Sequence, residues 1–305
     1  MSFNLQLLGL QSIHRIAGKL NLKVNLPRFS ELFGFSPTDF QLIIMKSEFI
    51  LKNLFKNFKI SWWDVYINSD IGMERMLIAK ELNLSSSDAL LDVGCGRGYF
   101  AIAAAKHCDF VVAIDLMNGF GRIGWWDQFS KTMEILGLHS NVCGVRANGV
   151  KLPLRNSSFT VAAIVHSIRN FHDKKTIFQV IREMKRVVIK GGSIIIVENL
   201  PIAKNKAQEA HLKMYRCKVK YSSGELYYMS RNEIVEIIEK VGFRDFEVNV
   251  VDYNLSSTPP LFYLNPDRLA DDVRENALKE FRNAVESIKV WGEASPPAIF
   301  IRAMK

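Results

Sequence analysis

The sequence predicts an α/β fold, in which a mostly parallel, seven-stranded sheet is flanked by helices and preceded by a helical N-terminal region. From residue 89 onward, short runs rich in β-branched residues alternate with stretches of helical periodicity, which is typical of parallel strands joined by crossover helices. The β-rich runs are almost continuously apolar, as expected for strands that helices cover on both faces. The segment before them is amphipathic and contains no convincing pair of strands, so we expect helices there.

Seven runs are predicted to be strands. They span residues 89–94, 110–115, 141–147, 160–166, 192–199, 246–253 and 298–304. Between the fourth and fifth runs, Asp173 is a suitable N-cap for a helix whose apolar periodicity continues to Gly191. Ser230 and Glu233 form a capping box that opens a second helix, and Gly242 is its predicted C-terminal stop.

We expect two parts in the chain. Residues 1–85 form the helical N-terminal region, on the side of the substrate, and residues 86–305 form the α/β domain. An insert at about 201–229 interrupts the path after the fifth strand, and an extra helix is predicted at about 266–291. Because ligands of α/β folds bind outside the carboxyl ends of the strands, this insert can form part of a lid.

Composition excludes several classes of protein. With 305 residues, of which 48% are hydrophobic and 23% charged, the chain can bury a core, so a disordered or fibrous protein is excluded. Charges interrupt every apolar run, so no membrane-spanning segment is predicted, and the first residues lack the basic region and cleavage site of a secretory signal. The four cysteines are far apart and no cluster of His and carboxylates has ligand spacing, so we expect no disulfide framework, no metal and a cytoplasmic location.

The net charge of +9 is concentrated in residues 1–60 and 200–220. Such segments suit an anionic substrate, the surface of a membrane or a nucleic acid, and a solvated surface is an equally good interpretation. Within the first segment, residues 43–59 place Leu51, Leu54, Phe55 and Phe58 on one side of a helix, which favours a core face over a membrane anchor. The oligomeric state is not indicated.

The glycine-rich run LLDVGCGRG (90–98) lies where a strand turns into a helix. Its glycines, Gly94, Gly96 and Gly98, allow a tight turn and close approach to a ligand, and the next helix offers its N-terminus to a polar or anionic group. Dinucleotide-binding folds use a similar loop, but Tyr99 stands where their fingerprint has Gly or Ala. Asp115, at the end of the second strand, can accept hydrogen bonds from both ribose hydroxyls of either NAD or S-adenosylmethionine.

Four motifs in order resemble those of the class I S-adenosylmethionine-dependent methyltransferases. They are LLDVGCGRG, Asp115, ANGVKLPLRNSSF (147–159) and KRVVIKGGSIIIVE (185–198). The resemblance covers roughly residues 75–200 and implies a Rossmann-like fold with S-adenosylmethionine as cofactor. A shorter run, 167–198, resembles the ubiquinone/menaquinone C-methyltransferase branch.

The resemblance also implies a role for individual residues. The three glycines would surround the methionine part of the cofactor, Asp92 would hold the loop, and Asn148 would take the place of the Asp that contacts the adenine amino group. The complete cofactor-binding set that it implies is Asp92, Gly94, Gly96, Gly98, Asp115, Leu116, Asn148, Gly149 and His166.

Methyl transfer to a phenolic or enolic acceptor requires removal of a proton, so a general base near the methyl group is expected. His166, after the fourth strand, is the best candidate, with Arg169 placed to stabilise an oxyanion and Glu198 as a second candidate. A buried packing role for His166 and a structural ion pair for Arg169 remain open.

We therefore expect a methyltransferase that acts on a small organic molecule, apolar or quinone-like. Methylation of RNA or protein through the basic segments is the second hypothesis, and a non-catalytic protein that binds the cofactor is the third. Peripheral contact with a membrane is also open. No cysteine lies between residues 144 and 216, so the covalent cysteine route of cytosine-C5 RNA enzymes lacks its nucleophile.

Overall fold

The computed structural model describes residues 3–117, 125–171, 173–221, 227–256 and 269–305. By their internal contacts, the residues fall into two compact units, each assembled from three separate stretches of chain. The helical unit consists of Met1–Glu74, Pro201–Tyr227 and Tyr253–Pro297, and the sheet unit consists of Arg75–Leu200, Tyr228–Asp252 and Ala298–Lys305. The division at residues 85 and 86 stays a prediction.

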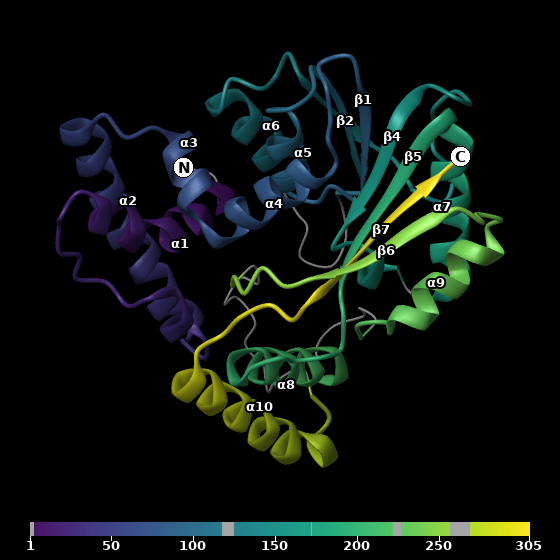
Figure 1. The fold of residues 1–305 in the computed structure, drawn as a ribbon. Coiled ribbons are helices and arrows are strands. Elements are labelled where there is room, and N and C mark those ends of the chain that lie inside the picture. Colours follow the sequence, from purple (N-terminus) through teal and green to yellow (C-terminus); the bar gives the residue numbers. More distant parts are fainter. Residues whose placement is uncertain (1–2, 118–124, 172, 222–226, 257–268) are drawn as a thin grey trace. The chain divides into compact units, whose positions relative to one another are not determined.

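The sheet unit is built on seven strands in the order β3-β2-β1-β4-β5-β7-β6 (Figure 1). The strands are β1 (Ala89–Val93), β2 (Phe110–Asp115), β3 (Val142–Arg146), β4 (Phe159–Val165), β5 (Val188–Asn199), β6 (Phe246–Val251) and β7 (Ala298–Met304). The first five are parallel, and β7 runs antiparallel to both β5 and β6. The predicted fold class, a seven-stranded and mostly parallel sheet of Rossmann-like type, is confirmed.

Helices cover both faces of this sheet. Figure 1 shows α5 (Tyr99–Ala104) and α6 (Trp125–Ile135) on one face, with α7 (Lys174–Val187) and α9 (Arg231–Lys240) on the other. The predicted caps are present, because Asp173 accepts the backbone N–H of Thr176 at 2.7 Å and Ser230 pairs reciprocally with Glu233. The central strands are therefore buried on both sides, as their apolar sequences require.

The predicted boundary between the helix after Asp173 and the fifth strand is wrong. The helical periodicity continues to Gly191, but α7 ends at Val187 and β5 begins at Val188. The backbone N–H of Gly191 donates to the carbonyl of Lys305 at 2.9 Å, so pairing with the last strand extends β5 through the two glycines.

Apart from the short helix η2 (Ile168–Asn170) of the sheet unit and the helix α4 (Asp70–Glu81), the helical unit contains the other helices that the structure describes. They are α1 (Phe3–Lys19), η1 (Phe29–Leu32), α2 (Pro37–Phe58), α3 (Trp62–Asn68), α8 (Lys206–Tyr221) and α10 (Asp271–Trp291). Helix α1 packs against α2 and α3, and α8 packs against α10. The remaining helix, α4, spans the boundary between the two units. The predicted start of the extra helix, near residue 266, lies outside the described residues.

The predicted core face of α2 is present in part. Leu51 and Leu54 are buried, whereas Phe58 is 41% exposed. No helix in the described ranges is both long and apolar enough to cross a membrane, and the same ranges hold no group of three His, Cys, Asp or Glu residues arranged for a metal. The cytoplasmic location stays a prediction.

Candidate functional site

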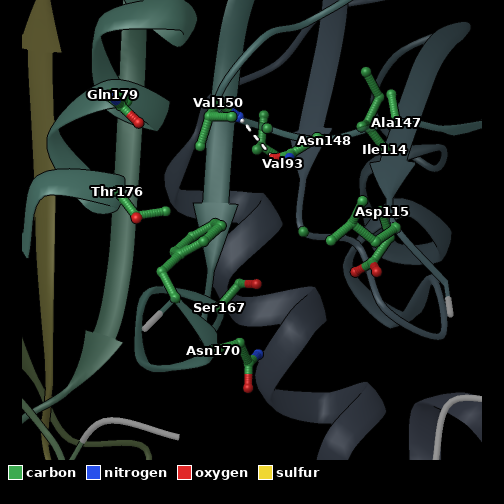
Figure 2. Close-up of a pocket in the computed structure, with 14 residues that line it drawn as sticks. Val93, Ile114, Asp115, Ala147, Asn148, Val150, Ser167, Asn170, Thr176 and Gln179 are labelled. Atoms are coloured by element: carbon green, nitrogen blue, oxygen red, sulfur yellow. Dashed lines mark hydrogen bonds between the residues drawn. The ribbon is translucent and has the colours of Figure 1, made fainter. Parts of the chain in front are cut away.

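A pocket of about 390 Å³ opens at the carboxyl ends of the parallel strands in the sheet unit (Figure 2). Its lining comes from the ends of β1, β2, β3 and β4 and from the first turns of α7. The lining residues are Val93, Gly94, Ile114, Asp115, Leu116, Ala147, Asn148, Gly149, Val150, Ser167, Asn170, Phe171, Thr176 and Gln179. This edge of the sheet is where α/β folds bind ligands.

Asp115 joins the pocket to the glycine loop. Its carboxylate accepts the backbone N–H of Gly96 at 2.8 Å and that of Met117 at 2.9 Å. The residue is 8% exposed, and a carboxylate has about four acceptor sites. The side chain therefore fixes the loop and, as part of the pocket lining, places a carboxylate where hydroxyls of a ligand would bind.

The glycines of the loop are required by conformation and by space. Gly94 and Gly98 have φ angles of 72° and 81°, in the left-handed region that favours glycine. A Cβ on Gly94 would collide with the hydroxyl of Ser167, and a Cβ on Gly98 would lie 2.6 Å from Phe129 and Met133. The loop thus lies directly against the segment after β4 and against α6.

Substitution of Gly98 by alanine separates the effect of backbone conformation from the effect of limited space. Gly191 has nearly the same φ, 80°, but nothing lies within 4 Å of its Cβ position, so Gly191→Ala is a matched control. Gly191→Ala is expected to cost about 1 kcal/mol of unfolding free energy through backbone strain alone, and Gly98→Ala about 1–3 kcal/mol more through crowding. Urea denaturation of both variants measures the difference. Equal losses would contradict the steric role of Gly98.

Asp92 lies in β1 beneath the loop and does not line the pocket. It accepts the backbone N–H of Ala101, while its Oδ2 atom has no hydrogen-bond partner among the described residues. Burial, reinforced by the charge of Asp115, raises the pKa of Asp92 to about 7, although Arg75 acts in the opposite direction. The residue is therefore placed to hold the start of α5, and it is close to half-protonated at neutral pH.

The residues after β2 and β3 form one wall of the pocket. The Oδ1 atom of Asn148 accepts the backbone N–H of Val150 at 3.1 Å, the contact drawn in Figure 2. A Cβ on Gly149 would lie 3.3 Å from Val180, a tight contact that would require Val180 to shift by a few tenths of an ångström. Leu116 is 43% exposed and offers an apolar surface. An adenine contact through Asn148 is thus available from its amide N–H groups and from the second lone pair of Oδ1.

The polar residues of the other wall, after β4 and in α7, were not predicted to contact a ligand. Ser167 and Asn170 follow β4, and Thr176 and Gln179 lie in the first turns of α7 (Figure 2). The last two are three residues apart, which places them on one face of a helix. That spacing of polar residues, just after an N-cap, is the signal that could have identified them.

Next to this wall is a group of charged residues that follow β4 or lie near the end of β5. Arg169 donates from Nη1 to Oε1 of Glu198 at 2.7 Å, and Nδ1 of His166 lies 3.5 Å from the same oxygen. Glu198 is fully buried, and Arg169 and His166 overcome the cost of its burial and lower its pKa to about 2. Arg169 also lies over the ring of Tyr228, 5.7 Å from its centre. Glu198 is therefore ionised at neutral pH and fixes the guanidinium.

The predicted catalytic residues lie beside the pocket and do not line it. His166 has a positive φ of 51°, and its side chain is only 3% exposed, whereas that of Arg169 is 22% exposed. Their sequence neighbours Ser167 and Asn170 reach the lining. Arg169 is thus the more accessible of the two, and their catalytic roles stay predictions.

The lining suits S-adenosylmethionine, the cofactor that the resemblance implies. Asp115 offers a carboxylate to hydroxyl groups, and Asn148 offers an amide to a ring edge. Val93, Ile114 and Leu116 supply apolar surface for a flat base. A ligand with a ribose, a purine and a polar tail therefore finds a partner for each part.

Comparison with known proteins gives a consistent result. The family model described as "Methyltransferase domain" matches residues 91–196, the stretch from β1 to β5. A demethylmenaquinone methyltransferase of Corynebacterium efficiens is 30% identical over 119 residues, which are 39% of this chain and 45% of that protein. An enzyme of the same name from Alkalihalophilus pseudofirmus is 25% identical over 203 residues, covering 64% of this chain and 72% of the relative. The chain thus spans less than half of the length of the Corynebacterium relative.

Solved structures share the fold. A cyclopropane-fatty-acyl-phospholipid synthase-like protein from Lactobacillus casei superposes with a TM-score of 0.59 at 15% identity, covering 77% of this chain and 91% of that one. The YcgJ protein from Bacillus subtilis gives 0.51 at 15% identity, with 76% and 98% covered. The matched domain, the relatives and the strand order agree, and the chain is similar to the class I S-adenosylmethionine-dependent methyltransferases.

Proposed function

We propose that this protein transfers the methyl group of S-adenosylmethionine to a small, apolar, quinone-like acceptor. One observation carries the proposal: the cofactor-type pocket adjoins an ion pair between the partly exposed Arg169 and the buried Glu198, with His166 beside it. The relatives that bear the name demethylmenaquinone methyltransferase support a quinone-like acceptor.

The bound cofactor would supply a methyl group already activated by its positive sulfur. The protein then has mainly to position the acceptor and to handle its proton. Asp115 and Asn148 would hold the nucleoside, and Ser167 and Asn170 would face the remainder of the pocket. These residues set where the reactive end lies.

Arg169 is the residue that we assign to the acceptor oxygen. Its guanidinium stays charged, and Glu198 holds it from the buried side without a conformational search. A charge fixed in advance stabilises a phenolate or enolate as it forms. His166, 3.5 Å from the same carboxylate, would accept the proton.

The ion pairs of α8 argue against the second hypothesis, methylation of RNA or protein through the basic segments. Lys206 pairs with Glu209 and Lys220 pairs with Glu280, each at 2.8 Å. Two of the six basic residues of segment 200–220 are thus paired with acids of the helical unit, and paired cations contribute less to the binding of a polyanion.

Turnover tests the proposal. Purified protein is incubated with labelled S-adenosylmethionine and a short-chain prenylated naphthoquinol, and the labelled product is extracted. Arg169→Ala is expected to lower kcat by about 10²–10³-fold, because it removes a fixed charge from the developing oxyanion. Its affinity for S-adenosylhomocysteine should stay within about 3-fold of the wild type.

Arg155→Ala, at an exposed position outside the pocket lining, is the matched control and should keep full activity. Labelling of RNA or protein without labelling of any quinol would contradict the proposal. Cofactor binding without turnover on quinols or on fractionated extracts would identify a non-catalytic binding protein.

A further inference from the structure

Helix α2 presents a row of large apolar side chains to solvent. Leu42, Met45 and Phe49 are 52%, 60% and 68% exposed. Their spacing of three and four residues places them along one face of the helix. Single exposed apolar residues are ordinary, but three adjacent ones on one face indicate an interaction surface.

Lysines border this row. Because a helix turns by about 100° per residue, Lys46 lies on one side of the apolar row and Lys52 on the other. Lys56 lies in line with the row, toward the C-terminal end of the helix. All three are exposed, and within the described parts of the chain they make no ion pair or hydrogen bond. Their charge is therefore available to a partner.

The two acids of α2 do not neutralise this face. Asp39 caps the first turn with Ser36, and Glu48 accepts a hydrogen bond from Gln6 at 2.6 Å. Glu48 thus faces α1, and Asp39 is engaged at the helix start. The face made of Leu42, Met45, Lys46, Phe49, Lys52 and Lys56, called here the α2 face, carries only positive charge.

The other side of α2 fixes the helix in place. Phe40, Ile44, Leu51 and Leu54 are buried, and Phe40 and Ile44 pack in a cluster with Leu7, Leu10 and Leu32. The α2 face is consequently held in a folded helix and needs no ordering step when it binds a partner.

We propose that the α2 face docks the protein on an anionic phospholipid surface. An apolar centre with lysines along its edges is the arrangement by which helices lie in the interface of a membrane, the apolar side chains among the acyl chains and the lysines at the headgroups. The inference stands on this face alone and does not depend on the proposed function.

Charge argues against two other occupants. In a symmetric pair of chains joined through the α2 face, lysines of one copy would lie near lysines of the other, which is unfavourable. A nucleic acid would satisfy the lysines but would leave Leu42, Met45 and Phe49 without apolar partners. An anionic lipid surface satisfies both parts of the face.

Sedimentation with lipid vesicles tests the inference. The full chain is mixed with vesicles of 70% phosphatidylcholine and 30% phosphatidylglycerol, or of phosphatidylcholine alone. We expect partitioning onto the anionic vesicles to be at least about 10-fold stronger and to weaken as salt is raised. The triple variants L42S/M45S/F49S and K46Q/K52Q/K56Q should each lose about 10-fold or more.

The matched control K131Q/K190Q/K279Q removes the same charge at exposed positions elsewhere and should bind like the wild type. Because every substituted side chain is exposed, unchanged circular dichroism and melting temperature verify the fold. Equal binding to both vesicle types, or wild-type binding by both α2 variants, would overturn the inference. A dimer in sedimentation velocity that L42S/M45S/F49S abolishes would assign the face to a second copy instead.

Discussion

Replacing Asp115 by alanine is expected to weaken the binding of S-adenosylhomocysteine by about 100-fold or more. A carboxylate that accepts two hydrogen bonds from a ribose contributes about 1.5–3 kcal/mol for each one. The substitution also removes the acceptor that holds the N–H of Gly96 at 2.8 Å, so the glycine loop loses an anchor. Isothermal titration calorimetry measures the affinity of both proteins.

Asp109→Ala is the matched control, because Asp109 is exposed just before the same strand and is not part of the pocket. Its affinity should equal that of the wild type. Asp115→Asn keeps an acceptor oxygen and should give an intermediate loss, provided that its melting temperature is unchanged. Wild-type affinity in Asp115→Ala would remove this carboxylate from the cofactor site.

A second large effect is expected in how stability depends on pH. The pKa of Asp92 is about 7 in the folded protein, against an ordinary value of 3.8. Between these values the folded state binds a proton that the unfolded chain has released, so this contribution to stability is complete below pH 3.8 and is lost as pH rises through 7. From about pH 5 to pH 8, the free energy of unfolding should fall by about 2–3 kcal/mol relative to Asp92→Asn, which stays neutral.

Urea denaturation at several pH values over this range measures both proteins. Asp109→Asn makes the same chemical change at an exposed position, and its difference from the wild type should stay constant with pH. A constant difference for Asp92→Asn as well would show that the buried carboxyl group does not titrate in this range.

The strands were predictable because their signal is local. A mostly apolar run between polar turns defines β2 and β7 to the residue. The start of β5 was not predictable in the same way, because it depends on pairing with distant residues: Val188 pairs with Phe159 of β4, and the N–H of Gly191 donates to the carbonyl of Lys305. A pair of glycines after a helical pattern is typical of a helix end, and only the distant strand overrides that pattern.

In the candidate site as well, residues in local motifs were predictable and long-range contacts were not. Gly94, Asp115 and Asn148 lie in short motifs that end consecutive strands, so the sequence contains their spacing, and the pocket includes all three. The bond from Arg169 to Glu198 joins residues that are 29 positions apart. Each was a candidate alone, but their pairing follows from β4 lying beside β5, which is a property of the folded sheet.

For helix α2, the periodicity of the sequence located the buried side correctly at Leu51 and Leu54. It did not separate the second apolar row, at Leu42, Met45 and Phe49, from the core. An amphipathic pattern identifies a face that avoids water, but it does not say how much of that face the rest of the chain covers.

The strand order has a consequence for the order of folding. In the sheet, β7 lies between β5 and β6, yet α8, α9, β6 and α10 all separate β5 from β7 along the chain. Contacts between distant segments slow folding, although the entropy of closing a loop grows only slowly with its length. Among the strands that the structure describes, β6 pairs with β7 alone, so within them it has no neighbour to bind until residues 298–304 have left the ribosome. During synthesis, β1 to β5 can assemble the cofactor-type pocket first, while the exposed edge of β5 waits for its partner.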